Sequence, residues 1–446
     1  MALTVKHLNS DASFLLSFEP VYTDPTRGSV VVPQPFTILL DPWITGPSKI
    51  FHSRFSVTTH KTPPCVSSLS ELPEPDLVII SQHKSDHCNE ATLRQLPASG
   101  TKTLILAEPA SARLIRSWKY FDRDKIRTIE PWKDRRAAGK STILRVPVPP
   151  VTPGGQGGEI TVSWIPQKRD IAGLHGAIGI TYRPPPSYSL SKLAAMSPRS
   201  DLLTPPATPV SIKMPAAVLL SASTIDVNHL PSSPPISPRS LRSVQSASTL
   251  IPSPVRGTYP TRSLSRCLPS RSRTTSMAHG TRPISLLFSP HGISFAHIGP
   301  WATSHLVSEA ALPLTALLHC MDSITNPWWL GGNICSGTLT GADIANKLGA
   351  RVWVSAHDAE KEVKGIGTGL LKTRKWEREE IVGIVSPGIT NDKTGIENGA
   401  KKENLGLGMG MDKGTEVLRL ESGEEVLVTG EGMVLAASGK AKGKVE

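Results

Sequence analysis

Short apolar runs bounded by turn residues fill the first 183 positions of the chain. Runs rich in Leu, Ile, Val and Phe predict strands, and two longer stretches with helical spacing predict helices. The strands are predicted at Ser13–Phe18, Phe36–Leu40, Leu77–Ile80, Thr103–Leu106 and Ile160–Trp164, and the helices at Asn89–Leu96 and Ala110–Trp118. Strands and helices that alternate in this way indicate a mixed α/β fold.

The same kind of pattern returns after residue 282. Helical spacing recurs over Ser304–Cys320 and Gly341–Leu348, and apolar runs predict strands at Ile284–Phe288 and Ala350–Ser355. We therefore expect residues 1–183 and 283–388 to be two halves of one domain.

A Gly/Lys-rich linker is expected at 389–414, followed by a terminal hairpin and tail at 415–446. The hairpin is predicted because Glu416–Leu420 and Glu425–Thr429 flank the turn sequence Glu421-Ser422-Gly423-Glu424.

Residues 184–282 differ in composition from both halves. They contain 21 Ser, 9 Thr and 16 Pro but no Phe or Trp, so they cannot bury enough apolar surface to offset the entropy of ordering. We predict a disordered insertion there. Its Ser-Pro pairs and Arg residues among serines suit kinases as partners, and each phosphate would subtract about 1.5–2 charges. The alternative is an unregulated spacer.

The chain has 446 residues and a formal charge of +12, which by itself favours a nucleic-acid or acidic membrane partner. The insertion holds 11 basic and 2 acidic residues, so +9 of that charge belongs to it. The other 347 residues carry 38 basic and 35 acidic side chains and are nearly neutral. They lack a basic stripe with stacking aromatics, so we expect no nucleic-acid partner.

The cysteine content and the hydropathy of the chain exclude further classes of protein. The 5 Cys include no CxxC pair, which argues against a disulfide framework and a Cys-rich zinc module. No window approaches about 18 uninterrupted apolar residues, so no transmembrane segment is expected. Because Met1–Glu19 lacks the layout of a secretory signal, we predict a cytoplasmic protein, with the nucleus as the alternative.

The most informative stretch is Asp76–Leu93, with the sequence DLVIISQHKSDHCNEATL. An apolar strand ends at Ile80, a polar loop holds His83, Asp86 and His87, and a helix follows. Layered α/β proteins place ligands in loops at the C-terminal ends of strands, because the rigid sheet fixes side chains that the loop exposes. This loop is therefore the first candidate for a functional site.

This strand, loop and helix resemble the HxHxDH segment of the metallo-β-lactamase superfamily, whose fold is a four-layer αββα sandwich with metals at one sheet edge. In that alignment Asp86 and His87 take the places of the motif's Asp and last His. The motif's first two His fall on Gln82 and Lys84. A later segment, Ile160–Lys168, resembles the loop of the third His, with Gln167 or Lys168 in its place. The family's first metal site is thus replaced by non-ligands.

Two further segments resemble the loops that complete the second metal site. Ile284–Gly292 resembles the strand that delivers the bridging carboxylate, and His291 stands at that position. Leu330–His357 resembles the Gly-rich loop, helix and strand that end in the last His ligand, which is His357. The resemblance covers the chain outside the insertion and the tail.

The resemblance implies a mononuclear metal site held by Asp86, His87, His291 and His357. Three imidazoles and one carboxylate suit Zn²⁺, with Fe or Mn as alternatives. A metal-bound water would then attack an ester, lactone or phosphodiester in a small-molecule substrate. Lys84 would repel a metal from the first site and hold an anionic substrate group.

Other residues compete for a place at this site. His83 is one residue out of register with the motif and could turn inward, and His175 could be a ligand or a general base. A histidine in a loop is more often a surface residue than a ligand. The prediction therefore rests on all four candidates lying at the matching strand ends and in the matching order along the chain. Of the two neighbouring tryptophans, Trp328 is expected to close the core and Trp329 to form a substrate wall.

Within the superfamily the chain is similar to the branch of ascorbate-phosphate lactonase and phospholipase-D-type phosphodiesterases, and to uncharacterised fungal proteins with a Gln-His-Lys-x-Asp-His loop. A metal-dependent hydrolase is the first hypothesis. The alternative is a non-catalytic binding or regulatory protein with the same fold, controlled by phosphorylation of the insertion.

Overall fold

The computed structural model describes residues 1–19, 34–50, 56–134, 139–150, 155–170, 172–186, 282–365, 369–386, 414–429 and 434–436. All of them belong to one compact unit, which is built from Met1–Ser197 and His279–Glu446. The predicted insertion with its phosphorylation sites, and the predicted linker, lie outside the described residues except for a few positions at their ends. Within the described ranges, no helix has both the length and the apolar character needed to cross a membrane.

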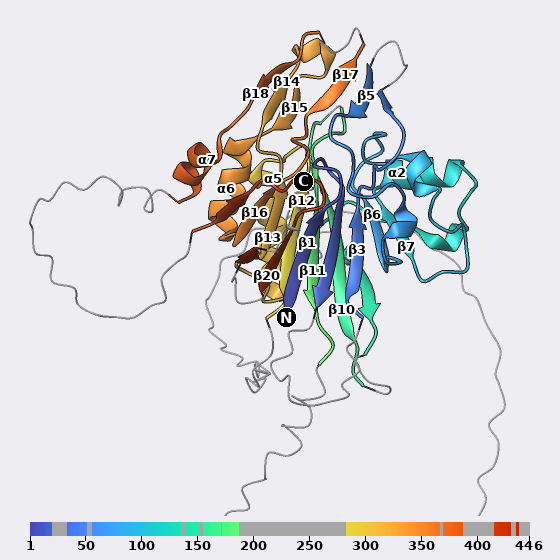
Figure 1. Ribbon diagram of the computed structural model, residues 1–446. Helices are drawn as coiled ribbons and strands as arrows, with labels where there is room; N and C mark the ends of the chain where they lie inside the picture. The colour runs from blue at the N-terminus through green and yellow to red at the C-terminus, as the bar shows by residue number, and fades with distance from the viewer. Residues whose placement is uncertain are drawn as a thin grey trace, which may run out of the picture. The chain divides into compact units, whose positions relative to one another are not determined.

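Two large β-sheets form the centre of this unit (Figure 1). Within the described ranges, the first sheet has the strand order β21-β20-β1-β2-β3-β6-β7-β8 and the second has the order β19-β16-β13-β12-β11-β10-β9. The first consists of β1 (Ala2–His7), β2 (Phe14–Glu19), β3 (Phe36–Leu40), β6 (Leu77–Ile80), β7 (Leu104–Ala107), β8 (Ile126–Thr128), β20 (Glu425–Thr429) and β21 (Val434–Ala436). The second consists of β9 (Leu144–Val148), β10 (Gly158–Pro166), β11 (Gly176–Arg183), β12 (Ile284–Ser289), β13 (Ala316–His319), β16 (Val352–Ser355) and β19 (Glu416–Leu418).

Each sheet combines antiparallel and parallel strands. In the first sheet β3, β6, β7 and β8 run parallel, and in the second β12, β13, β16 and β19 run parallel. Parallel neighbours need long crossover connections, which loops and helices supply here. The loops that follow β6, β12 and β16 carry the candidate site.

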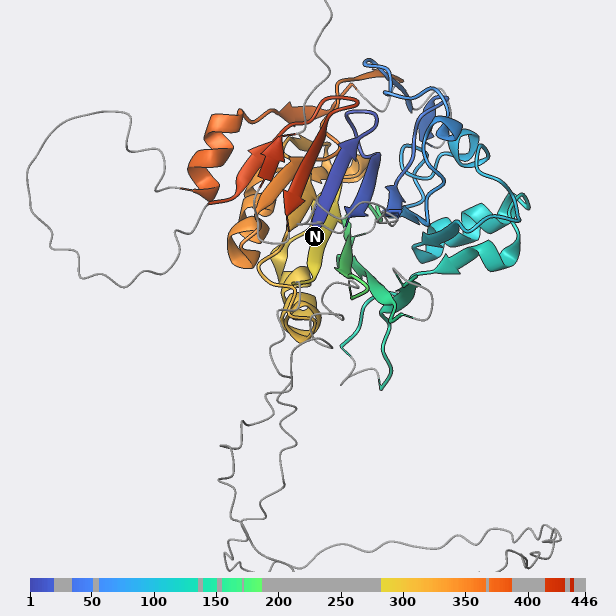
Figure 2. The same ribbon diagram turned by 60° about the horizontal axis from the view of Figure 1, so that its bottom comes forward.

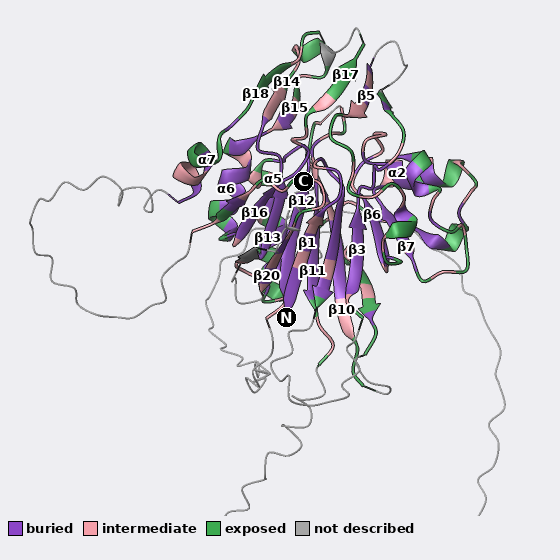
Figure 3. Ribbon diagram, in the orientation of Figure 1, coloured by how far each residue is buried: buried purple, intermediate pink, exposed green. Residues whose placement is uncertain are grey.

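Alternate side chains along the strands face two different apolar layers. In β3, Ile38 and Leu40 lie in a core shared by both sheets, whereas Leu39 belongs to the layer outside the first sheet. In β12, Leu286 faces the shared core and Leu287 faces the layer outside the second sheet. Strands buried on both faces form continuous apolar runs, and Figure 3 shows both sheets buried along most of their length.

Helices cover the two outer faces of the sheets. α1 (Glu90–Leu93) and α2 (Pro109–Ser117) pack on the first sheet, and α5 (Phe295–Trp301), α6 (Thr338–Leu348) and α7 (Arg378–Val385) pack on the second. Figures 1 and 2 show α2 on the opposite side of the strands from α6 and α7. The layers therefore follow the order helix, sheet, sheet, helix, and the predicted four-layer α/β fold is confirmed.

Two small antiparallel sheets lie at one end of the large ones (Figure 1). One contains β14 (Ser323–Thr325), β15 (Asn333–Ser336) and β18 (Lys372–Arg374). The other contains β4 (Ser48–Ile50), β5 (Ser56–His60) and β17 (Lys361–Lys364). β17 begins four residues after His357, so this second small sheet borders the candidate site.

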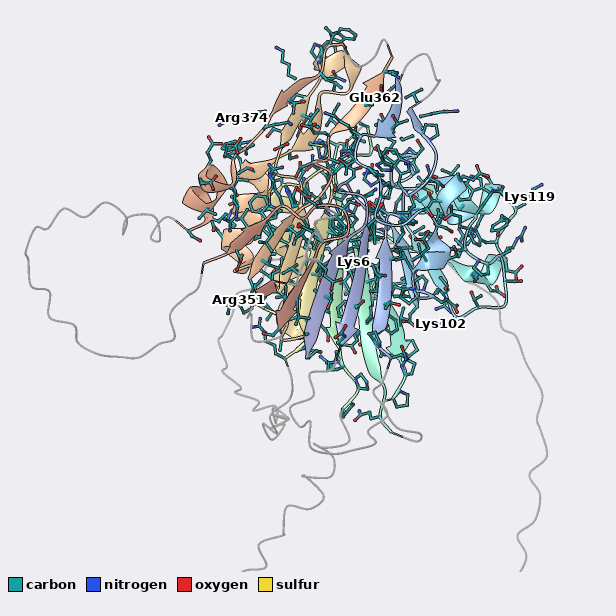
Figure 4. All side chains as sticks on the ribbon, in the orientation of Figure 1. Lys6, Lys102, Lys119, Arg351, Glu362 and Arg374 are labelled. Carbon is teal, nitrogen blue, oxygen red and sulfur yellow. The ribbon has the colours of Figure 1, made fainter. Side chains whose placement is uncertain are left out.

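Acidic and basic side chains are interspersed on the surface of this unit. Figure 4 shows Lys102 and Lys119 on the side of the first sheet, and Arg374 and Glu362 on the two small sheets. Lys102 pairs with Asp76 at 2.9 Å. This mixture agrees with the near-neutral charge of the sequence outside the insertion.

The helical spacing from Ser304 to Cys320 does not continue as one helix, so that prediction is wrong. Helix α5 passes into the wider helical turn η3 (Ala302–Leu306), the chain turns at Ala310 with a φ of 53°, and Ala316–His319 is strand β13. Pro313 cannot donate a helical backbone bond. β13 is buried between β12 and β16, and an apolar run buried on both faces has no period that separates strand from helix.

The predicted terminal hairpin is also wrong. β19 pairs with β16 in the second sheet, whereas β20 pairs with β1 in the first. The turn signal is real, since Gly423 has a φ of +91° that favours glycine. It directs the chain from one sheet to the other, however, and a turn sequence does not specify which sheet each strand joins.

His305 gives the fold a predicted pH dependence. Burial lowers the pKa of its imidazole from 6.5 to about 4, against a smaller raising effect of Glu309, and its Nε2 lies 2.8 Å from Thr161 Oγ1. The folded state thus prefers the neutral ring. The contribution of His305 to the free energy of unfolding is therefore complete above pH 6.5 and is lost as the pH falls toward 4, by about 3 kcal/mol in total. We expect His305→Gln to remove this slope. If the free energy of unfolding has the same pH dependence in the parent and in His305→Gln between pH 6.5 and 4, the prediction is wrong.

Candidate metal centre

Three buried histidines converge at the end of the sheets where the small sheets lie. His87, His291 and His357 each offer a ring nitrogen, and these atoms all lie within 4.8 Å of one another. The Nε2 atoms of His87 and His291 are 3.1 Å apart, and the rings of His291 and His357 have centroids 4.3 Å apart. The three residues could hold a metal ion.

Each histidine follows a buried strand. His87 ends the loop after β6, just before Asn89 caps α1 by accepting the Thr92 N–H at 2.9 Å. His291 follows β12, and His357 follows β16. His357 has a φ of +70°, a conformation that non-glycine residues rarely adopt. Strain of this kind persists only where neighbours fix it, and here the His357 N–H donates to the Asp11 carbonyl at 2.9 Å.

The second ring nitrogen of each histidine faces an acceptor. His87 Nδ1 lies 2.8 Å from a carboxylate oxygen of Asp41, and His357 Nδ1 lies 3.1 Å from one of Asp11. His291 Nδ1 lies 2.9 Å from the carbonyl of Ile334. An acceptor at Nδ1 orients each ring and turns its Nε2 atom toward the other two rings. The Lys361 ammonium lies beside His357 as well, 3.2 Å from its Nδ1 and 3.5 Å from its Nε2. The three Nε2 atoms thus face one space, as in metal sites whose ligands are oriented by outer partners.

The fourth predicted ligand, Asp86, lies beside the same space. Its Oδ2 is 4.0 Å from His87 Nε2 and 3.9 Å from His357 Nε2. Its Oδ1 is buried and has no hydrogen-bond partner among the described residues. Buried polar atoms rarely stay unpaired, because desolvation without a partner is costly.

These distances fit one small cation. Nitrogen and oxygen ligands at about 2.0–2.2 Å from a tetrahedral Zn²⁺ lie roughly 3.3 Å from each other. The 3.1 Å between His87 Nε2 and His291 Nε2 matches that value. Asp86 Oδ2, at 4.0 and 3.9 Å from His87 Nε2 and His357 Nε2, would have to move a little closer. Against the lowering effect of burial, Asp86 and Asp41 raise the pKa of His87, so its Nε2 can donate a proton to His291 Nε2 at 3.1 Å. A metal ion bound between the two rings would take the place of that proton.

Two members of the cluster, His291 and Asp86, are in the ionisation state that suits a cation. Burial, with the nearby charges of His357 and His87, lowers the pKa of His291 well below its ordinary value, so this ring is neutral. Burial alone would raise the pKa of Asp86, but His87, His357 and Lys361 lower it overall, so this side chain is a carboxylate. A neutral imidazole and a carboxylate are the forms that bind metals.

Three residues of this centre were not identified from the sequence. Asp41 and Asp11 orient His87 and His357, and Lys361 places its ammonium 2.8 Å from Asp11 and 3.2 Å from His357 Nδ1. Asp41 could have been found, because it directly follows an apolar strand, as Asp86 and His291 nearly do. Asp11 and Lys361 carry no such signal.

The predicted catalytic residues lie beside the histidines, outside their cluster. The half-buried Lys84 accepts backbone bonds from His87 and Cys88 at 2.9 and 2.7 Å. His175 has Nδ1 2.8 Å from the Gly292 carbonyl and Nε2 3.0 Å from the Asn333 carbonyl. Both ring nitrogens of His175 thus face backbone oxygens, and its predicted role as ligand or base stays a prediction. The Lys361 ammonium, by contrast, contacts one of the three histidines, His357.

His83 and the two tryptophans lie away from the three histidines. His83 Nδ1 is 3.9 Å from Glu108, and its side chain is 40% exposed. Trp328 and Trp329, on η4 (Trp328–Leu330), are 87% and 62% exposed. The expectation that Trp328 closes the core is therefore wrong, because the β14–β15 connection projects into solvent.

Comparison with known proteins gives matches among solved structures. No protein-family model and no curated protein matches the chain. The solved structure of Igni18, described as a metallo hydrolase from the hyperthermophilic archaeon Ignicoccus hospitalis KIN4/I, is similar to this chain with a TM-score of 0.39 and 10% sequence identity. The similarity covers 96% of this chain and 98% of that one. The function of the site is therefore argued from its own geometry.

Proposed function

We propose that the chain is a metal-dependent hydrolase of the metallo-β-lactamase superfamily with a mononuclear centre at His87, His291, His357 and Asp86. One observation carries the proposal: three buried imidazoles bring their ring nitrogens together while an acceptor lies at each Nδ1. Partners of this kind orient the histidine ligands of metal sites.

His87, His291, His357 and Asp86 would hold a divalent ion, Zn²⁺ above all, which would supply a Lewis acid able to acidify a water molecule at neutral pH. Asp41 and Asp11 keep His87 and His357 in the orientation and tautomer that bind it. Lys361 adds a fixed positive charge beside His357, where it can stabilise negative charge that develops on an ester, lactone or phosphodiester.

The test is the metal content of the purified full-length chain. Prepared without chelators, the protein is expected to hold about one equivalent of a divalent transition metal by elemental analysis. It should hydrolyse at least one chromogenic ester, lactone or phosphodiester, lose this activity on chelation, and regain it with Zn²⁺. Fewer than about 0.2 equivalents after gentle purification would contradict a site with the affinity of known zinc centres.

A further inference from the structure

A cavity of about 200 Å³ lies beside the histidine cluster. Gln82 and His83, from the loop that also bears His87, line one wall, and Pro290, which precedes His291, lines another. An engineered protein cavity of about 150 Å³ accepts benzene, so this one suits a group of a few heavy atoms. It is the size of one end of a small substrate.

The cavity occupies the place of the replaced ligands. Gln82 and Gln167 both line it; in the resemblance to the metallo-β-lactamase motif, Gln82 stands where one histidine of the first metal site would be, and Gln167 or Lys168 where another would be. A glutamine offers an amide oxygen and an amide N–H₂ in place of an imidazole. The cavity therefore has hydrogen-bonding groups where a second ion would otherwise be expected.

Gln82 provides the decisive observation. Its side chain is 4% exposed, and its Oε1 atom has no hydrogen-bond partner in the part of the chain that the structure describes. A buried acceptor without a donor costs about 1–3 kcal/mol. This oxygen is closed off from solvent in the structure, so a ligand donor reaches it when the Gln82 side chain turns into the cavity, and the new hydrogen bond removes this cost.

The charged groups of the cavity favour the same kind of ligand. Glu108 and Asp170 line it, whereas no lysine or arginine is among its described lining residues. The Glu108 carboxylate caps helix α2 by accepting the N–H groups of Ala110 and Ser111, and Asp170 accepts the N–H of Gly173 at 3.1 Å. Carboxylate oxygens accept more than one bond, so both can also receive a ligand donor. Two carboxylates would repel an anion.

We propose that this cavity binds the non-reacting end of the substrate through a group that donates hydrogen bonds, an ammonium or a hydroxyl, and rejects an anionic group. Gln82 is the specificity-determining residue, with Glu108 and Asp170 supplying negative potential. The inference rests on the proposed function, since it places this end of the molecule next to the metal centre.

Three probes of equal length test the proposal on the full chain: n-propylamine, 1-propanol and propionate, with dissociation constants measured by ligand-observed NMR at pH 7. We expect n-propylamine and 1-propanol to bind through Gln82, so Gln82→Leu should weaken both by about tenfold. Gln82→Glu should strengthen n-propylamine alone. Gln156→Leu, at an exposed glutamine, is the matched control and should change nothing.

Two outcomes would overturn the proposal. One is that Gln82→Leu binds n-propylamine and 1-propanol with the same dissociation constants as Gln156→Leu. The other is propionate binding that Gln82→Leu weakens. If the probes bind through Gln82 while the chain holds no metal, the cavity proposal is supported and the hydrolase proposal fails. If the chain holds a metal but the binding of the probes does not depend on Gln82, the hydrolase proposal is supported and the cavity proposal fails.

Discussion

Replacing His291 by alanine is expected to lower the affinity of the chain for its metal by at least about 100-fold, because loss of a direct ligand exceeds the 10- to 100-fold effect of losing an outer partner. His291 is the most central candidate: its Nε2 lies 3.1 Å from that of His87, and its ring is 4.3 Å from that of His357. Metal content by elemental analysis and competition with a chromogenic chelator measure the loss. Hydrolysis of the substrate found for the parent protein should fall with it.

The matched control is His297→Ala, which removes a partly exposed imidazole from α5, away from the three histidines. It should retain the metal and the activity. Asp41→Asn should fall between the two, because the amide keeps the shape of the carboxylate while weakening the bond that orients His87. An His291→Ala protein that unfolds like the parent and keeps its full metal content would show that the ion, if present, lies elsewhere.

Replacing Trp301 by alanine is expected to lower the free energy of unfolding by about 3–5 kcal/mol, as for other buried large-to-small changes. Trp301 is fully buried in the layer between the second sheet and its helices, where it packs with Leu287 and Leu317. Urea unfolding at neutral pH measures the change. Trp328→Ala removes the same side chain from an 87% exposed position and should cost less than about 0.5 kcal/mol.

Gly179 gives a second measurement of the same packing. A Cβ atom added there would overlap the Trp301 ring, so Gly179→Ala should destabilise the protein by about 1–3 kcal/mol. Because the alanine clashes with Trp301 itself, most of this cost should disappear in the Trp301→Ala background. Additive effects of the two substitutions would contradict the contact.

The residues of the metal centre differ in how far the sequence reveals them. Asp86, His87, His291 and His357 each follow an apolar run, so a pattern of strand ends leads to all four. Asp11 lies 346 positions from the histidine that it orients, and Lys361 belongs to a short exposed strand. Only the three-dimensional pairing of distant segments brings them to the site.

The fold shows the same division. Strands such as β3, β6 and β12 were predicted within one residue, because burial on both faces makes them uniformly apolar. The strand partners of β19 and β20 were not predicted, because the apolar pattern of either strand could be buried in either sheet. Similarly, β13 was taken for part of a helix, because its periodicity is lost when both faces are buried.

The pairing of β20 with β1 also affects how the chain can fold. β1 and its second neighbour, β20, are more than 400 positions apart in the sequence, so this pair is complete only when Thr429 has been made. The shared core therefore has one of its walls closed by a contact between residues more than 400 positions apart, as in the bond between His7 and Leu420. Contacts of such separation slow folding, because loop closure precedes the interactions that reward it. Until β20 pairs with it, the edge of β1 that faces β20 stays open.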